Sequence, residues 1–178
     1  MIVQYTRQLF MEEAHIDSYV EQYTIGWMKT TQSKIYVSRS LSDTRTLAEE
    51  FVHDLKQDVH HATVFGLSGD LGSGKTSFTK EVAELLGIKK DEVTSPTFVI
   101  EKIYTIRHHH FSHLIHIDAY RLENAEELVH LGWNDILKES KNLILIEWPE
   151  KVSEVVPGYA QTIKFTFVDE TTREIIFP

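Results

Sequence analysis

Short apolar runs alternate with amphipathic stretches along most of this chain, and the alternation predicts its elements. Residues 62–68 and 142–147 are rich in apolar side chains and have the length of buried strands. Residues 34–39 alternate between polar and apolar side chains, as a half-buried strand does. The same reasoning places further strands at residues 97–105, 114–118, 161–168 and 173–177.

Apolar residues recur at helical spacing in three other stretches. Ser42 is a good N-cap, and Leu47 and Phe51 follow it on one helical face. The first predicted helix begins after Ser42. The second begins after Thr76 and ends at Gly87, and the third covers residues 123–131. Strands that alternate with helices and close in a C-terminal β-hairpin predict an α/β fold of three layers with a mixed central sheet.

Composition narrows the classes of function. The chain has 178 residues, enough for one domain, and its lack of cysteine excludes disulfides, thiol catalysis and thiolate metal sites. It has no apolar run long enough to span a membrane and no secretion signal, so we expect a cytoplasmic protein. A formal charge of -9 disfavours direct binding of DNA or RNA, so any contact with RNA should run through a protein partner.

Residues 69–76, GDLGSGKT, match the phosphate-binding pattern GxxxxGK[ST] between an apolar strand and an amphipathic helix. Glycines let backbone N–H groups approach a polyphosphate, and the helix N-terminus adds a positive dipole end. No guanine-recognition string such as NKxD occurs, which favours ATP. The nucleotide-binding residues predicted from this pattern are Gly69, Asp70, Leu71, Gly72, Ser73, Gly74, Lys75 on the β/γ oxygens and Thr76 on Mg²⁺.

Two carboxylates follow apolar strands: Asp118 ends one and Glu147 ends the other. If both strands run parallel to residues 62–68, both carboxylates emerge at the sheet edge that carries the phosphates. One could hold Mg²⁺ and the other could orient the attacking water. The alternative for each is a helix N-cap or a surface ion pair.

Besides the phosphate-binding pattern, the chain carries SPTF at residues 95–98, HIDAYRL at 116–122, EEL at 126–128 with LG at 131–132, and EWPE at 147–150. Together these strings resemble the TsaE family, formerly YjeE, over residues 34–178. The resemblance implies a P-loop NTPase-like fold, hydrolysis of ATP with Mg²⁺, and support of threonylcarbamoylation of adenosine 37 in tRNAs that read ANN codons. The implied partners are the proteins TsaD and TsaB.

By resemblance, Thr76 and Glu147 are the Mg²⁺ ligands and Asp118 is the acid needed for hydrolysis. We therefore take Asp118, Lys75 and Glu147 as the candidate catalytic residues.

Five more residues are candidates at or near the nucleotide. Resemblance places Thr44 near its base and sugar and Glu150 in contact with it. Ser95 and Thr97 fall in a loop similar to the switch that senses the γ-phosphate. Ser77 follows the phosphate loop, and its hydroxyl and N–H could reach the α-phosphate; the alternative is a solvated first-turn serine.

Parts of the sequence fall outside this pattern. Residues 1–33 precede the family-like ATPase domain at 34–178, as a genuine extension or as the product of a mis-assigned start ahead of Met28. Residues 108–110 are three histidines, which form an exposed loop or, as the alternative, hold a metal. Trp148 either packs in the core or covers the nucleotide.

Two other functions compete with that of a tRNA-modification ATPase. A small-molecule kinase shares the phosphate loop but needs a cationic lid, and the six arginines of this chain are widely spread. A nucleotide-dependent switch with negligible hydrolysis would carry the same motifs.

Overall fold

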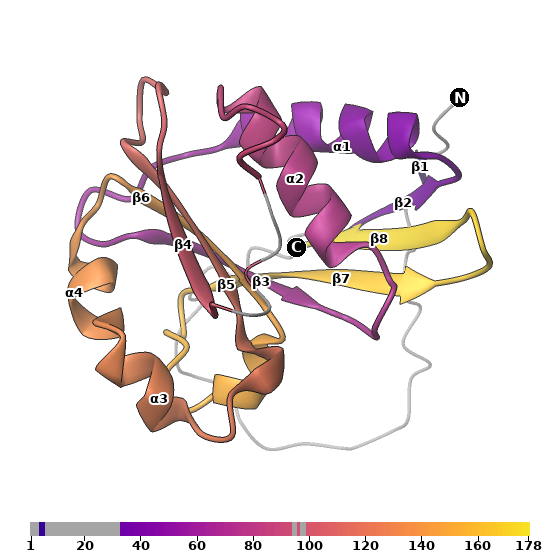
Figure 1. The fold of residues 1–178 in the computed structure, drawn as a ribbon. Helices are drawn as coiled ribbons and strands as arrows, with labels where there is room; N and C mark the ends of the chain where they lie inside the picture. The colour runs from indigo at the N-terminus through magenta and orange to yellow at the C-terminus, as the bar shows by residue number, and fades with distance from the viewer. Residues whose placement is uncertain (1–3, 6–32, 94–95, 97–98) are drawn as a thin grey trace, which may run out of the picture.

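The computed structural model describes residues 4–5, 33–93, 96 and 99–178, and in them one mixed sheet of eight strands lies between two layers of helices (Figure 1). The strand order is β1-β2-β8-β7-β3-β6-β5-β4. This confirms the predicted three-layer α/β fold with its mixed sheet and C-terminal hairpin. The strands are β1 Gln4–Tyr5, β2 Lys34–Ser38, β3 Thr63–Ser68, β4 Glu101–Thr105, β5 His113–Asp118, β6 Asn142–Glu147, β7 Gln161–Phe167 and β8 Arg173–Phe177.

The helices of the described residues lie on both faces of the sheet. One face carries α1 and α2, and the other carries α3 and α4 (Figure 1). The helices are α1 Leu41–Asp54, α2 Lys75–Leu85, α3 Ala125–His130 and α4 Trp133–Lys138, with 3₁₀ turns η1 Ala119–Arg121 and η2 Pro149–Val152.

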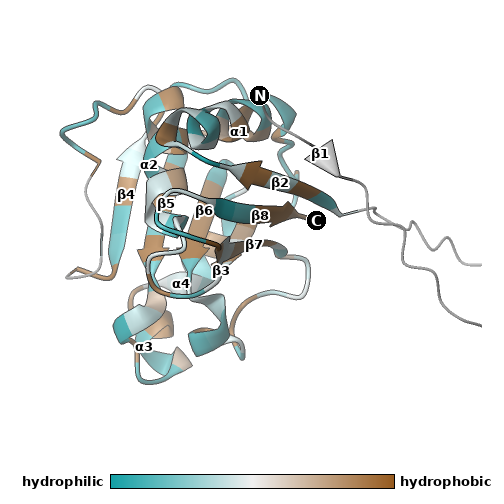
Figure 2. Ribbon diagram, turned by 90° about the vertical axis from the view of Figure 1, so that its right-hand side faces the viewer, coloured by the Kyte–Doolittle hydropathy of each residue, from teal (hydrophilic) through white to brown (hydrophobic). Residues whose placement is uncertain are grey.

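The middle of the sheet is parallel. Strand β3 pairs in parallel with β6 and β7, and β6 pairs in parallel with β5. Every residue of β6 is buried, as expected for a strand covered by helices on both faces. Edge strand β4 is mostly hydrophilic (Figure 2). The expectation that the strands ending in Asp118 and Glu147 run parallel to residues 62–68 is confirmed.

Two hydrophobic clusters hold the layers together, one on each face of the sheet. Leu143 and Leu145 of β6 face α1 and α2, where Phe51 and Phe78 pack with ring centroids 5.4 Å apart. Alternate residues of the same strand face α3 and α4, where Trp133 is fully buried. This strict alternation decides which side chains at the strand ends point toward α2.

Helix α1 begins earlier than the sequence suggested. Ser40, not Ser42, is its N-cap: the Ser40 backbone is extended, and its side chain accepts a hydrogen bond from Asp43 N at 3.1 Å. The prediction for Ser42 was wrong because that residue already lies in the first helical turn. Gly87 follows α2 with a φ of 90°, as expected for a glycine just past a helix C-terminus.

Strand β4 begins later than the expected strand 97–105. Ile100 has a φ of 68°, and its N–H and that of Val99 both donate to Pro96 O, so the chain turns there instead of extending. Residues 97 and 98 lie outside the described residues. The expected helix 123–131 begins after the Asn124 N-cap, and α4 was not predicted at all.

Of the N-terminal 33 residues, the structure describes three. Gln4 and Tyr5 pair antiparallel with Tyr36 and Ile35 at the edge of the sheet. The other residues of the predicted extension 1–33 lie outside the described residues. Among those residues, no helix combines the length and apolar character needed to cross a bilayer.

Candidate nucleotide-binding site

The loop between β3 and α2 can be built only with glycine at its key positions. Gly69 has a φ of 144°, and a Cβ atom there would collide with the carbonyl oxygen of Phe165 on β7. Gly74 has a φ of 104° and is the N-cap of α2. The loop therefore needs positive φ angles at these glycines and lies in close contact with β7, and the glycine spacing in the sequence allows both.

Lys75 lies inside this loop. Its ammonium Nζ donates to Gly69 O at 2.6 Å and to Asp70 O at 2.9 Å, and only 4% of the residue is exposed. Burial lowers the pKa of Lys75, and nearby carboxylates, with Glu147 first among them, offset part of that effect. The result is a cation held at the centre of the loop and close to several negative charges.

Thr76 and Glu147, the two predicted Mg²⁺ ligands, are in contact. The Thr76 hydroxyl donates to Glu147 Oε2 at 2.8 Å, although 71 residues separate them in the sequence. A hydroxyl and a carboxylate are oxygen donors of the kind that Mg²⁺ takes. The pair could therefore share a magnesium ion at the N-terminus of α2.

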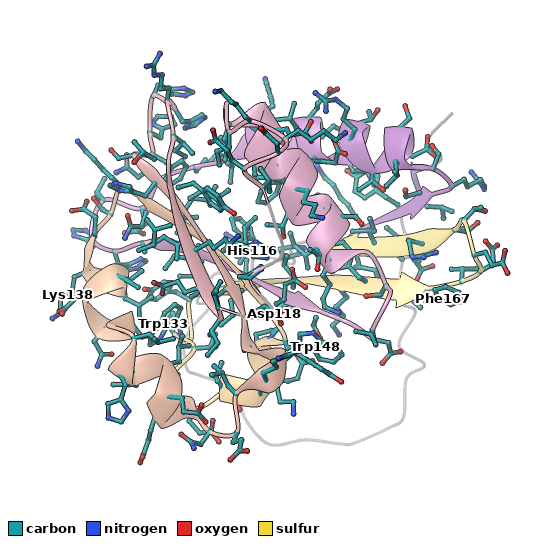
Figure 3. All side chains as sticks on the ribbon, in the orientation of Figure 1. His116, Asp118, Trp133, Lys138, Trp148 and Phe167 are labelled. Carbon is teal, nitrogen blue, oxygen red and sulfur yellow. The ribbon has the colours of Figure 1, made fainter. Side chains whose placement is uncertain are left out.

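Sequence reasoning missed His116, which touches the same carboxylate. Its Nε2 lies 2.8 Å from Glu147 Oε1, and the imidazole is fully buried. Alternation along β5 puts His116 on the same face as Asp118, so the period of two could have found it. Figure 3 shows Asp118 and Trp148 at the C-terminal ends of the central strands, with His116 further back along β5.

Asp118 stands beside Glu147 in the register of β5 and β6 and is 4% exposed. It also caps η1, because its Oδ1 accepts from Tyr120 N at 3.1 Å. The two interpretations offered for this residue therefore both describe its geometry: it lies at the sheet edge with the phosphate loop, and it is an N-cap.

A cavity of about 590 Å³ opens over these groups. Of the predicted residues, Gly69, Asp70, Ser73 and Glu150 do not line it. Ser73 is fully buried in the loop, and its hydroxyl has no hydrogen-bond partner in the described part of the chain. The predicted residues that line the cavity are Thr44, Leu71, Gly72, Gly74, Lys75, Thr76, Ser77, Asp118 and Glu147.

Thr44 lines the cavity from the first turn of α1. Its hydroxyl lies 2.8 Å from Ser38 Oγ and 3.3 Å from Ser40 O. Residues 38–41 line the cavity with it, a wall that sequence reasoning did not assign. Thr44 therefore lines the same cavity as the phosphate loop.

Arg173 was not predicted and supports the other wall of the cavity. Its Nε donates to Gly72 O at 3.1 Å, and its Nη1 donates to Asp169 O at 2.6 Å and to Thr172 O at 2.8 Å. The guanidinium also lies 4.6 Å from the centroid of the Phe167 ring. Arg173 therefore links the phosphate loop to the β7–β8 hairpin by hydrogen bonds, and no local sequence motif predicts this contact.

Trp148 lines the cavity directly after Glu147. Lys75 Nζ lies 4.0 Å above the centroid of its ring, and the Tyr120 ring is 5.1 Å away. The backbone of Trp148 is left-handed, with a φ of 59°, which is rare for a bulky residue. Trp148 also packs against the hydrophobic cluster beneath α3 and α4, so it both packs against the core and lines the cavity.

Some of the predicted residues do not line the cavity or lie outside the described residues. Ser95 and Thr97 lie outside the described residues. Glu150 is exposed, and its charge acts on Lys75 from outside the cavity lining. The rings of residues 108–110 contact one another at tilted angles, and His108 stacks on Phe111. Within the described residues no group of three or more His, Cys, Asp or Glu is arranged to hold a metal.

Comparison with known proteins gives one family. A tRNA threonylcarbamoyladenosine biosynthesis protein TsaE from Treponema pallidum is 34% identical over 139 residues, 78% of this chain and 96% of that protein. The TsaE of Borreliella burgdorferi is 44% identical over 94 residues, which span 53% of this chain and 65% of that relative.

A solved structure agrees with the sequence matches. The crystal structure of Bacillus subtilis YdiB, a P-loop NTPase-like fold, superposes with a TM-score of 0.61 at 29% identity and covers 82% of this chain and 84% of its own. The family model for threonylcarbamoyl adenosine biosynthesis protein TsaE matches residues 38–175. With most of its length matched, this chain belongs to the TsaE family.

Proposed function

We propose that this protein binds ATP with Mg²⁺ in the cavity, hydrolyses it slowly, and thereby supports threonylcarbamoylation of adenosine 37 in tRNAs that read ANN codons. The observation that carries the proposal is the contact of Thr76 with Glu147 at the N-terminus of α2, beside the buried ammonium of Lys75. This arrangement supplies a cation for the β/γ-phosphates and two oxygen ligands for the metal in one place.

The chain's own groups would divide the work as follows. The loop backbone and the N-terminus of α2 bind the phosphates, and Lys75 turns from the Gly69 and Asp70 carbonyls to the β/γ oxygens. Thr76 and Glu147 would hold Mg²⁺, which neutralises charge on the transferred phosphoryl group. Asp118, in register with Glu147, would orient the attacking water. Thr44 and Ser77 line the cavity where the rest of the nucleotide would lie.

Two further features support a role with partner proteins. The relatives carry the name of tRNA threonylcarbamoyladenosine biosynthesis, and the family resemblance implies TsaD and TsaB as partners. A formal charge of -9 gives the chain little affinity of its own for a polyanion. Contact with tRNA would therefore be indirect, through TsaD and TsaB, in the cytoplasm.

The first test is binding. Titration calorimetry with ATP and with ADP, each with Mg²⁺ and with EDTA, should show an affinity that rises when Mg²⁺ is present. Lys75→Ala should lower the affinity at least tenfold, roughly the effect of losing one charge-assisted contact. Lys80→Ala removes an exposed lysine from the same helix and should leave binding unchanged.

The second test is turnover. ATP hydrolysis should be slow for the protein alone, and modification of tRNA by TsaD and TsaB should require a hydrolysis-competent chain. A phosphorylated small molecule formed without tRNA would instead identify a kinase. Full support of modification by a non-hydrolysable ATP analogue would identify a switch. Absence of Mg²⁺-dependent binding of adenine nucleotides would contradict the proposal at its base.

A further inference from the structure

Each oxygen of the Glu147 carboxylate has its own side-chain partner. Oε2 accepts from the Thr76 hydroxyl at 2.8 Å, and Oε1 lies 2.8 Å from His116 Nε2. The side chains of His116 and Glu147 are 0% and 3% exposed, so water does not compete for the second contact. The carboxylate is thus held at both ends, between the cavity and the interior of the sheet.

The direction of the His116 contact follows from its chemistry. An ionised carboxylate only accepts hydrogen bonds, so Nε2 carries the proton and donates it. The other ring nitrogen, Nδ1, is buried and has no hydrogen-bond partner in the described part of the chain. The polar function of this imidazole is therefore directed at a single atom, Glu147 Oε1.

His116 reaches the cavity only through Glu147. It is absent from the cavity lining, whereas Thr76 and Glu147 both belong to it. A glutamate side chain has three rotatable bonds, and one hydrogen bond to Thr76 would leave the carboxylate free to turn about that contact. The second hydrogen bond removes this freedom and points Oε2 toward Thr76.

We propose that His116 is a positioning residue that fixes the Glu147 carboxylate for Mg²⁺, through the hydrogen bond from Nε2 to Oε1. The inference rests on the proposed function, because it concerns how the proposed metal ligand is oriented. The competing explanation is that the imidazole only fills space between β5 and β6. The two explanations predict different Mg²⁺ affinities for a variant that keeps the size of the His116 side chain and loses its hydrogen-bond donor.

The experiment compares His116→Leu, which keeps bulk and loses the donor, with His116→Gln, whose amide nitrogen can reach Oε1. Leu114→Val is the matched control, since Leu114 is buried on the same face of β5, two residues away. For each protein, calorimetry measures the affinity for ADP in EDTA and the Mg²⁺ concentration that half-maximally raises that affinity.

We expect the leucine variant to need about tenfold more Mg²⁺, the scale on which groups behind a metal ligand act. Its affinity for ADP in EDTA should stay at the wild-type value, and the glutamine variant should need no more than about threefold extra Mg²⁺. The control should match the wild type in both measurements.

Three results would overturn the inference: a wild-type Mg²⁺ requirement in the leucine variant, a glutamine variant no better than leucine, or an equal loss of ADP affinity with and without Mg²⁺. A wild-type protein that binds ADP without any response to Mg²⁺ would overturn the proposed function as well. If the leucine variant does not fold, His116→Asn replaces it, because that amide is too short to reach Oε1 while remaining polar.

Discussion

Asp118 and Glu147 occupy matching positions on neighbouring parallel strands, yet their surroundings differ. The two oxygens of Glu147 contact the side chains of Thr76 and His116, and Asp118 caps η1 by accepting from the backbone N–H of Tyr120. A carboxylate held by side chains beside the phosphate loop suits a metal ligand. Asp118 also lines the cavity, and the proposed function assigns it the orientation of the attacking water.

Asp118→Asn tests that division of roles. The amide oxygen of asparagine can still accept from Tyr120 N, so η1 keeps its cap and nucleotide affinity should change little. The charge that orients water is lost, and turnover should fall about 100-fold. Steady-state hydrolysis and ADP calorimetry on the same sample check this. Unchanged turnover would remove Asp118 from its assigned role.

Gly69→Ala tests the close approach of the phosphate loop to β7. A Cβ atom would collide with Phe165 O at a φ of 144°, so the loop must move. Strain of a few kcal/mol corresponds to a loss of nucleotide affinity of about tenfold or more. The control is Gly158→Ala, since a Cβ there meets nothing within 4 Å. Calorimetry with ADP measures both, and equal affinities would contradict the argument.

At the scale of elements, periodicity predicted the strands well and their boundaries less well. Strand β6 was predicted at its observed bounds, because a buried parallel strand is an unbroken apolar run. The start of α1 was misplaced because Ser40 and Ser42 are equally good caps in isolation. The choice between them depends on where β2 ends, and β2 is positioned by pairing with β8, far away in the sequence.

Edge strand β4 contains a testable electrostatic weakness. Burial raises the pKa of Glu101, and its Oε2 has no hydrogen-bond partner among the described residues. When the pKa of a carboxyl is higher in the folded state than in the unfolded state, the free energy of unfolding of the protein falls as the pH rises between those two pKa values. The weakness is therefore present at pH 7 and absent once the group is protonated in both states.

Glu101→Gln removes that charge and should raise the free energy of unfolding at pH 7. The gain should shrink as the pH is lowered toward about 3, well below the unfolded-state pKa of about 4.3, where the wild-type carboxyl is protonated in both states. Urea unfolding at the two pH values measures it. Glu154→Gln, at an exposed glutamate, should show no such difference. A gain of equal size at both pH values would point to a cause other than burial of the charge.

Across the whole molecule, the sequence predicted those parts of the site that are local in the chain. The phosphate loop follows from glycine spacing, and the strand-end carboxylates follow from apolar runs. That the two carboxylates meet at the edge with the loop depended on parallel pairing of their strands, which the sequence left as a condition. Arg173 and Trp148 acquire their places only when distant strands meet. The Arg173 bond to Gly72 spans 101 residues, and Trp148 meets Lys75 through the pairing of β3 with β6.

Removal of residues 1–32 tests the domain boundary at the scale of the molecule. The family model begins at residue 38, and β1 adds only two residue pairs to the edge of β2. The shortened protein should fold and bind ADP with wild-type affinity, as measured by circular dichroism and calorimetry. A large loss of binding would assign the N-terminal residues to the site. A native peptide that begins before Met28 would show that translation does not start there.

The bond between Arg173 and Gly72 also has a consequence for how the protein is made. The phosphate loop leaves the ribosome about 100 residues ahead of the arginine that secures its outer edge. A nascent chain interrupted between these two points would display the complete glycine motif without the brace that shapes it. If the proposed function holds, tight binding of nucleotide should therefore be delayed until β8 emerges.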